Sequence, residues 1–329
     1  MSSRLAIVRT TLASDDEWHS IAEACPYATY FHSPYWARVF SEYSHKTIQP
    51  YPRLITFSDN RTALIPLSYQ QHAHGLIKTY LSSPAGTFGG WIADAPLTAD
   101  HAHLLVDYML SMSNIVWREN PYDTVLNDSV IPQSTDDFTQ TVELRLRSWD
   151  DILASASRAH HKAVKKAEHA GLTVTQAINI EDWEQHYAAY QASMARWNKA
   201  GTTKKRMRPY GWDLFRLMYE LPVHHRILWT ARCSGAVAAS VLCFYWNNHA
   251  VAWHGAAYEE FFNLRPNNLL YQSMMQDAHT RGFSWFDCNT PGGLKGVAEF
   301  KEHLGTIKLK SRLVDKCGAI KTLYRMLHR

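Results

Sequence analysis

Apolar and polar residues follow two different periods in the second half of the chain. Three segments rich in β-branched and aromatic residues, at 226–232, 236–245 and 250–257, are separated by short turn sequences and predict a meander of antiparallel strands. Helical spacing predicts helices at 149–170, at 181–199 and from Pro266 to about 281. A strand at 283–288, a Gly-rich loop, a short helix around Glu299 and a strand at 307–313 are expected to complete this half.

The expected helix at 181–199 carries a stripe of large side chains at helical spacing. Its members are Trp183, Tyr187, Tyr190, Met194 and Trp197. Such a stripe is typical of a helix that packs on a core, and it is also compatible with one wall of a ligand channel. The sequence leaves both interpretations open.

The first half mixes short strands and helices. Strands are predicted at 5–9, 53–57 and 62–69, and helices at 16–24, 34–43 and 98–111. A segment rich in Asn, Asp, Ser, Thr and Pro at 123–136 precedes a further strand at 138–145.

These patterns together predict an α+β protein with mainly antiparallel sheets and two domains, 1–148 and 149–329. The last helix, about 317–329, is amphipathic. It is expected to dock on the first domain or to make a peripheral contact with a membrane surface.

Composition narrows the classes of protein. The chain has 329 residues, 46% of them hydrophobic, which is enough for a large core. Its net charge of +4 is too small for a dedicated nucleic-acid binder. Five cysteines without a Cys-x-x-Cys spacing favour neither a disulfide framework nor a zinc ribbon, so a reducing cytoplasm is the expected location. No apolar run is long enough to span a membrane, and the histidines lack metal-ligand spacing, so we expect neither a metal nor a tightly bound cofactor.

Four motifs follow one another near the end of the chain: residues 266–271 (PNNLLY), 282–287 (GFSWFD), 292–296 (GGLKG) and 300–305 (FKEHLG). Together with the meander they resemble the GNAT-type domain of the FemABX-like acyltransferases, which add aminoacyl groups to peptidoglycan precursors. In the first half, residues 31–38 (FHSPYWAR) resemble the family's first helix start. The resemblance implies two GNAT-like domains, of which the first is degenerate, and it implies that Trp36 binds substrate.

The resemblance places Phe300 and Lys301 at a functional Phe-Lys pair of the family. Lys301 would contact the acyl donor or the negative charge that develops on it; alternatively it is a surface lysine beside a core phenylalanine. Asp287 would orient Lys301 or an acceptor amine, or else cap the next loop. His254 would act as a base with a pKa near neutrality, or be satisfied inside the sheet.

The remaining candidate residues are expected to bind the acyl donor. Tyr258 faces the expected acyl site, Gly296 belongs to the Gly-rich loop, and Asn267 with Asn268 would either donate hydrogen bonds to phosphate or carbonyl oxygens or cap their helix. The 158, 162, 165 and 169 spacing of the basic helix puts Arg158, Lys162 and Lys165 on one face. That face would either bind transfer-RNA phosphates or be simply solvated.

Donor and acceptor remain open at this stage. Residues 264–268 (LRPNN) stand where GNAT enzymes usually carry the acetyl-CoA pyrophosphate loop, so acetyl-CoA is not the default donor. The donor is expected to be aminoacyl-tRNA or an acyl thioester such as an acyl-CoA. The acceptor would be an amine of a cell-wall or polysaccharide precursor or of a small molecule. Two alternatives are an acyl-CoA-dependent amino-sugar acyltransferase and a catalytically silent binding module.

Overall fold

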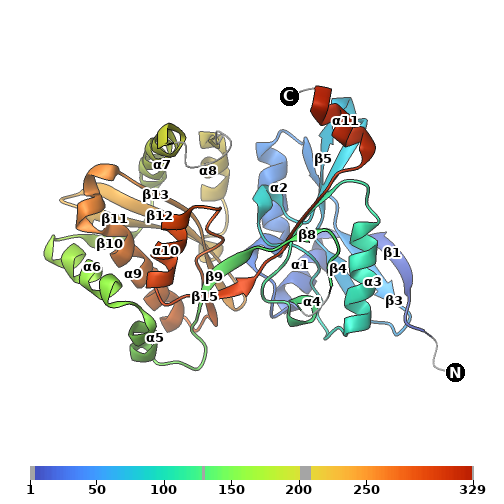
Figure 1. Ribbon diagram of the computed structural model, residues 1–329, viewed down its shortest axis with the longest axis horizontal. Coiled ribbons are helices and arrows are strands. Elements are labelled where there is room, and N and C mark those ends of the chain that lie inside the picture. Colours follow the sequence, from blue (N-terminus) through green and yellow to red (C-terminus); the bar gives the residue numbers. More distant parts are fainter. Residues whose placement is uncertain (1–3, 128–129, 201–208, 328–329) are drawn as a thin grey trace. The chain divides into compact units, whose positions relative to one another are not determined.

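The computed structural model describes residues 4–127, 130–200 and 209–327 and divides the chain into two compact units (Figure 1). Unit 1 comprises Met1–Phe138 and Leu309–Arg329, and unit 2 comprises Thr139–Lys308. The division falls at 138/139 and not at the expected 148/149, because strand β9 (Phe138–Glu143) pairs with β14 (Trp285–Asp287) of unit 2. The chain then returns to unit 1, where β16 (Leu313–Lys316) pairs with β7 (Ile115–Arg118).

Unit 2 is built on a seven-stranded sheet with the order β10-β11-β12-β13-β14-β9-β15. The expected meander is confirmed, with β11 (Arg226–Cys233), β12 (Ala236–Trp246) and β13 (His249–Ala257) in antiparallel register. The edges are β10 (Thr173–Gln176) and β15 (Ile307–Lys310). Strands β13 and β14 are parallel.

Helices cover both faces of this sheet. On one face, α6 (Arg158–His169) and α9 (Pro266–Thr280) share a core with Val241 and Cys243 of β12. Side chains alternate along a strand, so Ser240 lies on the opposite face, where it meets α7 (Ile180–Ala200). The short helix α8 (Trp212–Tyr219) packs on α7.

The aromatic stripe of α7 is mostly core. Trp183, Tyr190 and Met194 are buried, which confirms the core interpretation for these three residues. Trp197, at the other end of the stripe, is half-buried and lines a cavity described below. The stripe therefore changes from core to cavity wall along one helix.

Three expected elements are broken in the structure. The strand predicted at 62–69 is divided into strands at 62–65 and 68–72, which belong to different sheets. The helix predicted at 149–170 is two helices, α5 (Trp149–Ser155) and α6, because Ala156 is extended and the Ser157 side chain caps α6 by accepting a hydrogen bond from His160 N at 3.1 Å. The strand predicted at 307–313 is also divided, since β15 belongs to the sheet of unit 2 and β16 to a sheet of unit 1.

Unit 1 contains two sheets. The smaller has the order β1-β3-β4 and the larger the order β2-β5-β6-β7-β16-β8. The strands not yet bounded are β1 (Ile7–Leu12), β2 (Ile48–Pro50), β3 (Arg53–Phe57), β4 (Thr62–Ile65), β5 (Ser68–His72), β6 (Ile77–Leu81) and β8 (Ser134–Thr135). The helices are α1 (Asp15–Ala24), α2 (Pro34–Tyr43), α3 (Ala99–Leu110), α4 (Thr124–Asn127) and α11 (Ala319–Leu327).

In each unit a parallel pair of strands is joined through a helix. In unit 1, β6 and β7 are parallel and α3 connects them, as α9 connects β13 and β14 in unit 2. Beyond the pair in unit 1, Ser82 N donates to Val116 O at 2.9 Å and Gly89 N to Arg118 O at 2.8 Å. A Cβ at position 89 would lie 2.6 Å from the main-chain carbon of Ser82, so only glycine allows this approach. The chain itself thus closes the space beside the strands of unit 1.

Trp36 is a core residue of unit 1, contrary to its expected role in substrate binding. Its side chain is fully buried, and its indole N–H donates to Thr87 Oγ1 at 3.1 Å. The motif that resembled a helix start of the family does begin α2, with Ser33 as its N-cap. Trp36 lies on the buried side of that helix, and none of its surface is exposed to a ligand.

Candidate active site

The parallel strands of unit 2 separate after three residue pairs. Pairing runs from His249 opposite Trp285 to Val251 opposite Asp287, where β14 ends. Strand β13 continues to Ala257 on its β12 side, with a register shift at Leu242/Cys243, while the chain after Asp287 turns into a loop. An opening therefore forms between β13 and that loop, at the place that unit 1 closes with its own backbone.

The opening is a cavity of about 340 Å³, which we call the split cavity. Its walls come from the second half of β13, the loop after β14, the end of α7, and helices α9 and α10 (Lys295–His303). Most of the lining is apolar or aromatic. The lining residues used below are Arg196, Trp197, Trp253, His254, Gly255, Phe262, Asn267, Tyr271, Phe300 and Lys301.

Lys301 lies in the wall of the split cavity and is only 4% exposed. Its Nζ donates to the main-chain oxygens of Asn289 at 3.0 Å and Thr290 at 2.9 Å. Burial lowers the pKa of Lys301 below its ordinary value, against the opposing effects of Cys288 and Asp287. The alternative that it is a surface lysine is thus wrong. An ammonium has three N–H donors, so one remains for a ligand.

Phe300, the neighbour of Lys301, also lies beside the cavity. Its ring meets the Tyr271 ring edge to face, with centroids 5.3 Å apart. This contact joins α10 to α9 and fixes the turn of α10 that carries Lys301. The expected Phe-Lys pair is thus placed at one cavity, with the phenylalanine half-buried between two helices.

Asp287 is completely buried at the end of β14. Its Oδ1 accepts hydrogen bonds from Thr139 Oγ1, at 2.7 Å, and from the main-chain N–H of Asn289. The carboxylate therefore caps the loop whose carbonyl groups hold Lys301. The structure thus shows the capping alternative, and Asp287 acts on Lys301 through that loop.

His254 belongs to a chain of hydrogen bonds that begins at the split cavity. Its Nδ1 lies 3.1 Å from Nε2 of His186, whose Nδ1 lies 2.7 Å from Ser240 Oγ. Burial lowers the pKa of His254 to about 3 and that of His186 well below its ordinary value. The expectation of a base with a pKa near neutrality is therefore wrong, because desolvation among aromatic rings keeps both imidazoles neutral.

This histidine pair should make the protein sensitive to acid. A histidine with a lowered pKa binds fewer protons folded than unfolded, so its contribution is complete above pH 6.5 and is lost as pH falls toward 3. For His254 alone the loss by pH 5 is roughly 2 kcal/mol of unfolding free energy. Urea unfolding at pH 7.5 and pH 5 should show a smaller difference for His254→Gln than for the wild type. An equal difference in both proteins would contradict this assignment.

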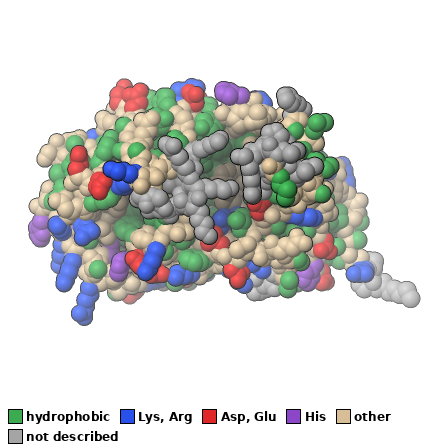
Figure 2. Space-filling view, turned by 45° about the horizontal axis from the view of Figure 1, so that its top comes forward, with side chains coloured by type: hydrophobic (Ala, Val, Ile, Leu, Met, Phe, Trp, Pro, Cys, Tyr) green, Lys and Arg blue, Asp and Glu red, His purple; other side chains and the backbone are tan. Residues whose placement is uncertain are grey.

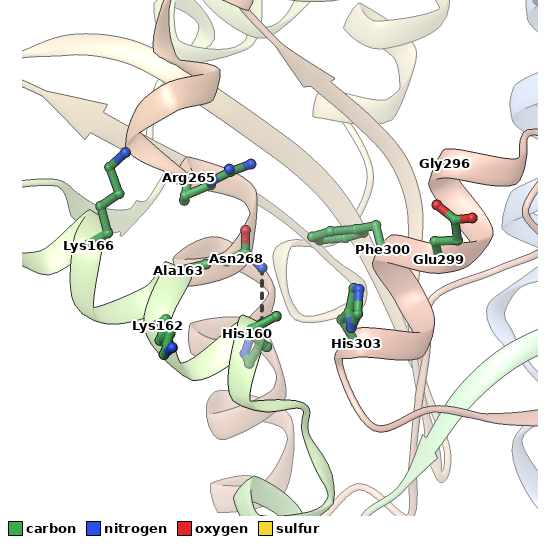
Figure 3. Close-up of a pocket in the computed structure, with 11 residues that line it drawn as sticks. His160, Lys162, Ala163, Lys166, Arg265, Asn268, Gly296, Glu299, Phe300 and His303 are labelled. Carbon is green, nitrogen blue, oxygen red and sulfur yellow. Dashed lines mark hydrogen bonds between the residues drawn. The ribbon is translucent and has the colours of Figure 1, made fainter.

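A second cavity, of about 530 Å³, lies where α6, α9 and α10 meet. We call it the basic cavity, because Lys162 and Lys166 of α6 and Arg265 before α9 line it, with Glu299 as its one acidic side chain among the described residues (Figure 3). Lys and Arg side chains also gather at the left of Figure 2, the side on which α6 lies in Figure 1. Anions are the expected ligands of such a cavity.

The structure corrects the face of α6 that meets this cavity. Lys162 lines it as expected, but Arg158 and Lys165 are not among its lining residues, and Lys166 lines it instead. The reason is helical spacing: the buried residues His160, Val164 and Ala167 fix the rotation of α6, which turns positions 162, 163 and 166 toward α9.

The two asparagines do not cap α9, because Arg265 with left-handed dihedral angles is its N-cap. Asn268 Nδ2 lies 3.1 Å from His160 Nδ1, which joins α9 to α6 (Figure 3). Pro266 has no N–H, and Asn268 N donates to Arg265 O, so this helix start offers few backbone donors to a phosphate. Anion binding here falls to side chains.

A third cavity, of about 420 Å³, has walls in common with the other two. It shares Arg196 and Asn267 with the split cavity, and Arg265, Asn268 and Gly296 with the basic cavity. Phe300 lines all three. The three cavities therefore adjoin one another between Lys301 and the lysines of α6, and we call them together the channel.

One residue predicted from the sequence does not line the channel, and two residues at the site were not predicted. Tyr258 begins a short 3-10 helix after β13 and is not among the residues that line the three cavities. Arg196 and His186 were not singled out. A signal for Arg196 exists in the sequence, since no acidic residue stands three or four positions from it to neutralise it within α7.

Comparisons with known proteins fit this architecture. Residues 154–302 match the model of the acetyltransferase (GNAT) domain family. The second unit is a GNAT acyltransferase domain. No curated protein matches the sequence.

Solved structures extend the likeness to the whole chain. FemX is similar in fold over 98% of this chain and 100% of its own, with a TM-score of 0.69 and 12% identity. A protein of unknown function from Bacteroides thetaiotaomicron (TM-score 0.54, 9% identity) covers 94% of this chain and 98% of its own. The C-terminal domain of a putative lysylphosphatidylglycerol synthetase from Agrobacterium fabrum (0.51, 12%) covers 89% and 94%. The expected fold, two GNAT-like units of the FemABX-like type, is confirmed.

The structure also bears on disulfide bonds, metal sites and membrane-spanning helices. The five cysteines form no disulfide bond. The described residues hold no group of three or more His, Cys, Asp or Glu side chains placed to bind a metal. Within the same residues, no helix combines the length and the apolar character that crossing a membrane requires.

Proposed function

We propose that the GNAT domain transfers an acyl or aminoacyl group from a phosphate-bearing donor to an amine. The observation that carries this proposal is the row of adjoining cavities around Phe300, with a mainly apolar cavity at Lys301 and a basic cavity at Lys162, Lys166 and Arg265. The acyl group occupies the split cavity, and the phosphates of its carrier occupy the basic cavity. Aminoacyl-tRNA and acyl-CoA both combine these two parts in one molecule.

The reaction needs little acid–base chemistry from the protein. The acceptor amine, in its neutral form, attacks the carbonyl carbon and forms the new C–N bond, and the carbonyl oxygen becomes an oxyanion. The remaining N–H of Lys301 donates to this oxyanion. Collapse breaks the bond to the ribose oxygen or the thioester sulfur, and the leaving group takes the proton lost by the amine. His254, in the wall of the split cavity, is neutral and therefore adds no further positive charge beside Lys301.

The acceptor is an amine of a cell-envelope precursor or of a small molecule. The resemblance to FemABX-like enzymes supports a cell-wall or polysaccharide precursor. An amino sugar acylated from acyl-CoA is the second candidate, and binding of CoA without binding of tRNA would favour it.

Donor binding should depend on the two lysines of α6 that line the basic cavity. We expect Lys162→Gln/Lys166→Gln to weaken binding of the donor at least tenfold and to flatten its salt dependence, since each lost phosphate contact removes about 0.7 to 0.9 from the slope of log K against log salt. Fluorescence titrations of charged tRNA and of acyl-CoA at several salt concentrations measure both quantities.

Arg158→Gln/Lys165→Gln is the matched control, because it removes the same charge from exposed positions of the same helix outside the cavity. Equal weakening by both pairs of substitutions would mean a diffuse effect of charge and would remove the basic cavity from the proposal. A steep slope with tRNA, against a shallow one with CoA, would identify the donor as tRNA.

A further inference from the structure

Arg196 is a half-buried arginine of α7 that lines both the split cavity and the third cavity. Its guanidinium stacks on the Phe262 ring, with its central carbon 4.7 Å from the ring centroid, and Nη1 donates to Ala257 O at 3.3 Å. Burial lowers the pKa of Arg196, and the through-space effect of Glu259 only partly offsets it. The protein thus holds a desolvated cation at the cavity wall.

Among the described residues, Arg196 has no carboxylate within ion-pair distance, whereas Arg232 pairs with Asp182 of the same helix. A guanidinium has five N–H donors, and one of those of Arg196 is used. Stacked arginines with free donors are suited to bidentate binding of a carboxylate or a phosphate. The partner that Arg196 lacks within the chain is therefore expected on the ligand.

The charges of the split cavity are of one sign. Its two charged side chains, Arg196 and Lys301, are cations, and none of the described residues that line it is Asp or Glu. An ammonium group at the Arg196 end of this cavity would be desolvated beside that cation, and no carboxylate among the described lining residues would compensate it.

We propose, on the basis of the proposed function, that the transferred group is a dicarboxylic acyl group whose free carboxylate binds Arg196. Its reacting carbonyl lies at Lys301 in the same cavity. Neutral acyl groups of similar length fit less well, and groups that end in an ammonium are excluded. Arg196 is a specificity-determining residue in this assignment.

The test compares three donors that share all their phosphates. Succinyl-CoA, butyryl-CoA and 3-aminopropionyl-CoA carry an anionic, a neutral and a cationic acyl terminus of similar length. The wild type should bind succinyl-CoA at least tenfold more tightly than butyryl-CoA, and 3-aminopropionyl-CoA most weakly. In Arg196→Met the preference for succinyl over butyryl should disappear while butyryl-CoA binds as before. For a tRNA donor the parallel series is aspartyl-, alanyl- and lysyl-tRNA, which share the α-ammonium next to the reacting carbonyl and differ in the charge of the side chain.

The outcomes separate this inference from the function on which it rests. Equal weakening of all donors in Arg196→Met would show that Arg196 holds a phosphate, and it would overturn the assignment to the acyl terminus. Equal affinity of the wild type for all three termini would overturn it as well, although acyl transfer would stand. Failure of every CoA and tRNA donor to bind would reject the proposed function itself.

Discussion

Replacement of Lys301 by methionine is expected to lower the rate of acyl transfer at least a hundredfold and to leave stability nearly unchanged. Loss of one preorganised donor to an oxyanion costs about 10²–10³ in rate. Two effects on stability oppose each other: the carbonyls of Asn289 and Thr290 lose their donor, and a buried ammonium without an ion-pair partner among the described residues is removed. The melting temperature should therefore change by only a few degrees.

The matched control is Lys295→Met, which makes the same chemical change in the first turn of α10. Lys295 is 91% exposed and pairs only with Glu299, at 3.7 Å. Its replacement should leave the rate unaffected, because surface pairs contribute little and it lies outside the three cavities.

Because the lowered pKa of Lys301 brings deprotonation to a lower pH, wild-type activity should fall at alkaline pH before an ordinary lysine loses its proton. Full activity in Lys301→Met would refute its role.

Glu119→Ala is expected to destabilise unit 1 by about 3–5 kcal/mol, the usual cost of leaving one member of a buried ion pair without its partner. Glu119 is completely buried, and both its oxygens accept hydrogen bonds from the Arg312 guanidinium, at 2.7 and 2.6 Å. The main-chain N–H of Arg312 donates to the same carboxylate at 2.9 Å. This pair attaches the segment that returns after unit 2 to strand β7 of unit 1.

The double variant Glu119→Ala/Arg312→Met separates the pair from its surroundings. It should recover most of the lost stability, since no charge is left uncompensated, and urea unfolding measures the difference. A cost below about 1 kcal/mol for Glu119→Ala would mean that solvent reaches the pair and that it does not anchor the segment.

The sequence predicted well those elements whose pattern is local. The meander was recognisable from its turns, and the start of α9 from Pro266, whose missing N–H suits the first helical position. The Phe300–Lys301 pair was recognisable because four motifs stand in a fixed order around it. Each of these features depends on residues that are neighbours in the chain.

The failures share a different cause, which is tertiary contact. The break between α5 and α6 depends on Ser157, whose main-chain N–H donates to His303 O of α10 at 3.0 Å. His254 looked like a base because its partner, His186, stands 68 residues earlier and the aromatic rings that desolvate it come from other elements. The rotation of α6, and with it the choice of Lys166 over Lys165, is set by packing against α9.

The most direct test of acyl binding in the split cavity compares the acylated donor with the deacylated one. Binding constants are measured for acyl-CoA against CoA, and for an aminoacyl-tRNA with a non-hydrolysable amide link against deacylated tRNA. If the acyl group binds in the split cavity, the true donor should bind at least tenfold more tightly when acylated. Gly255→Phe, which fills the split cavity from an exposed position with ordinary contacts, should abolish that advantage and leave the deacylated affinity unchanged. Equal affinities with and without the acyl group, for both kinds of donor, would contradict the account.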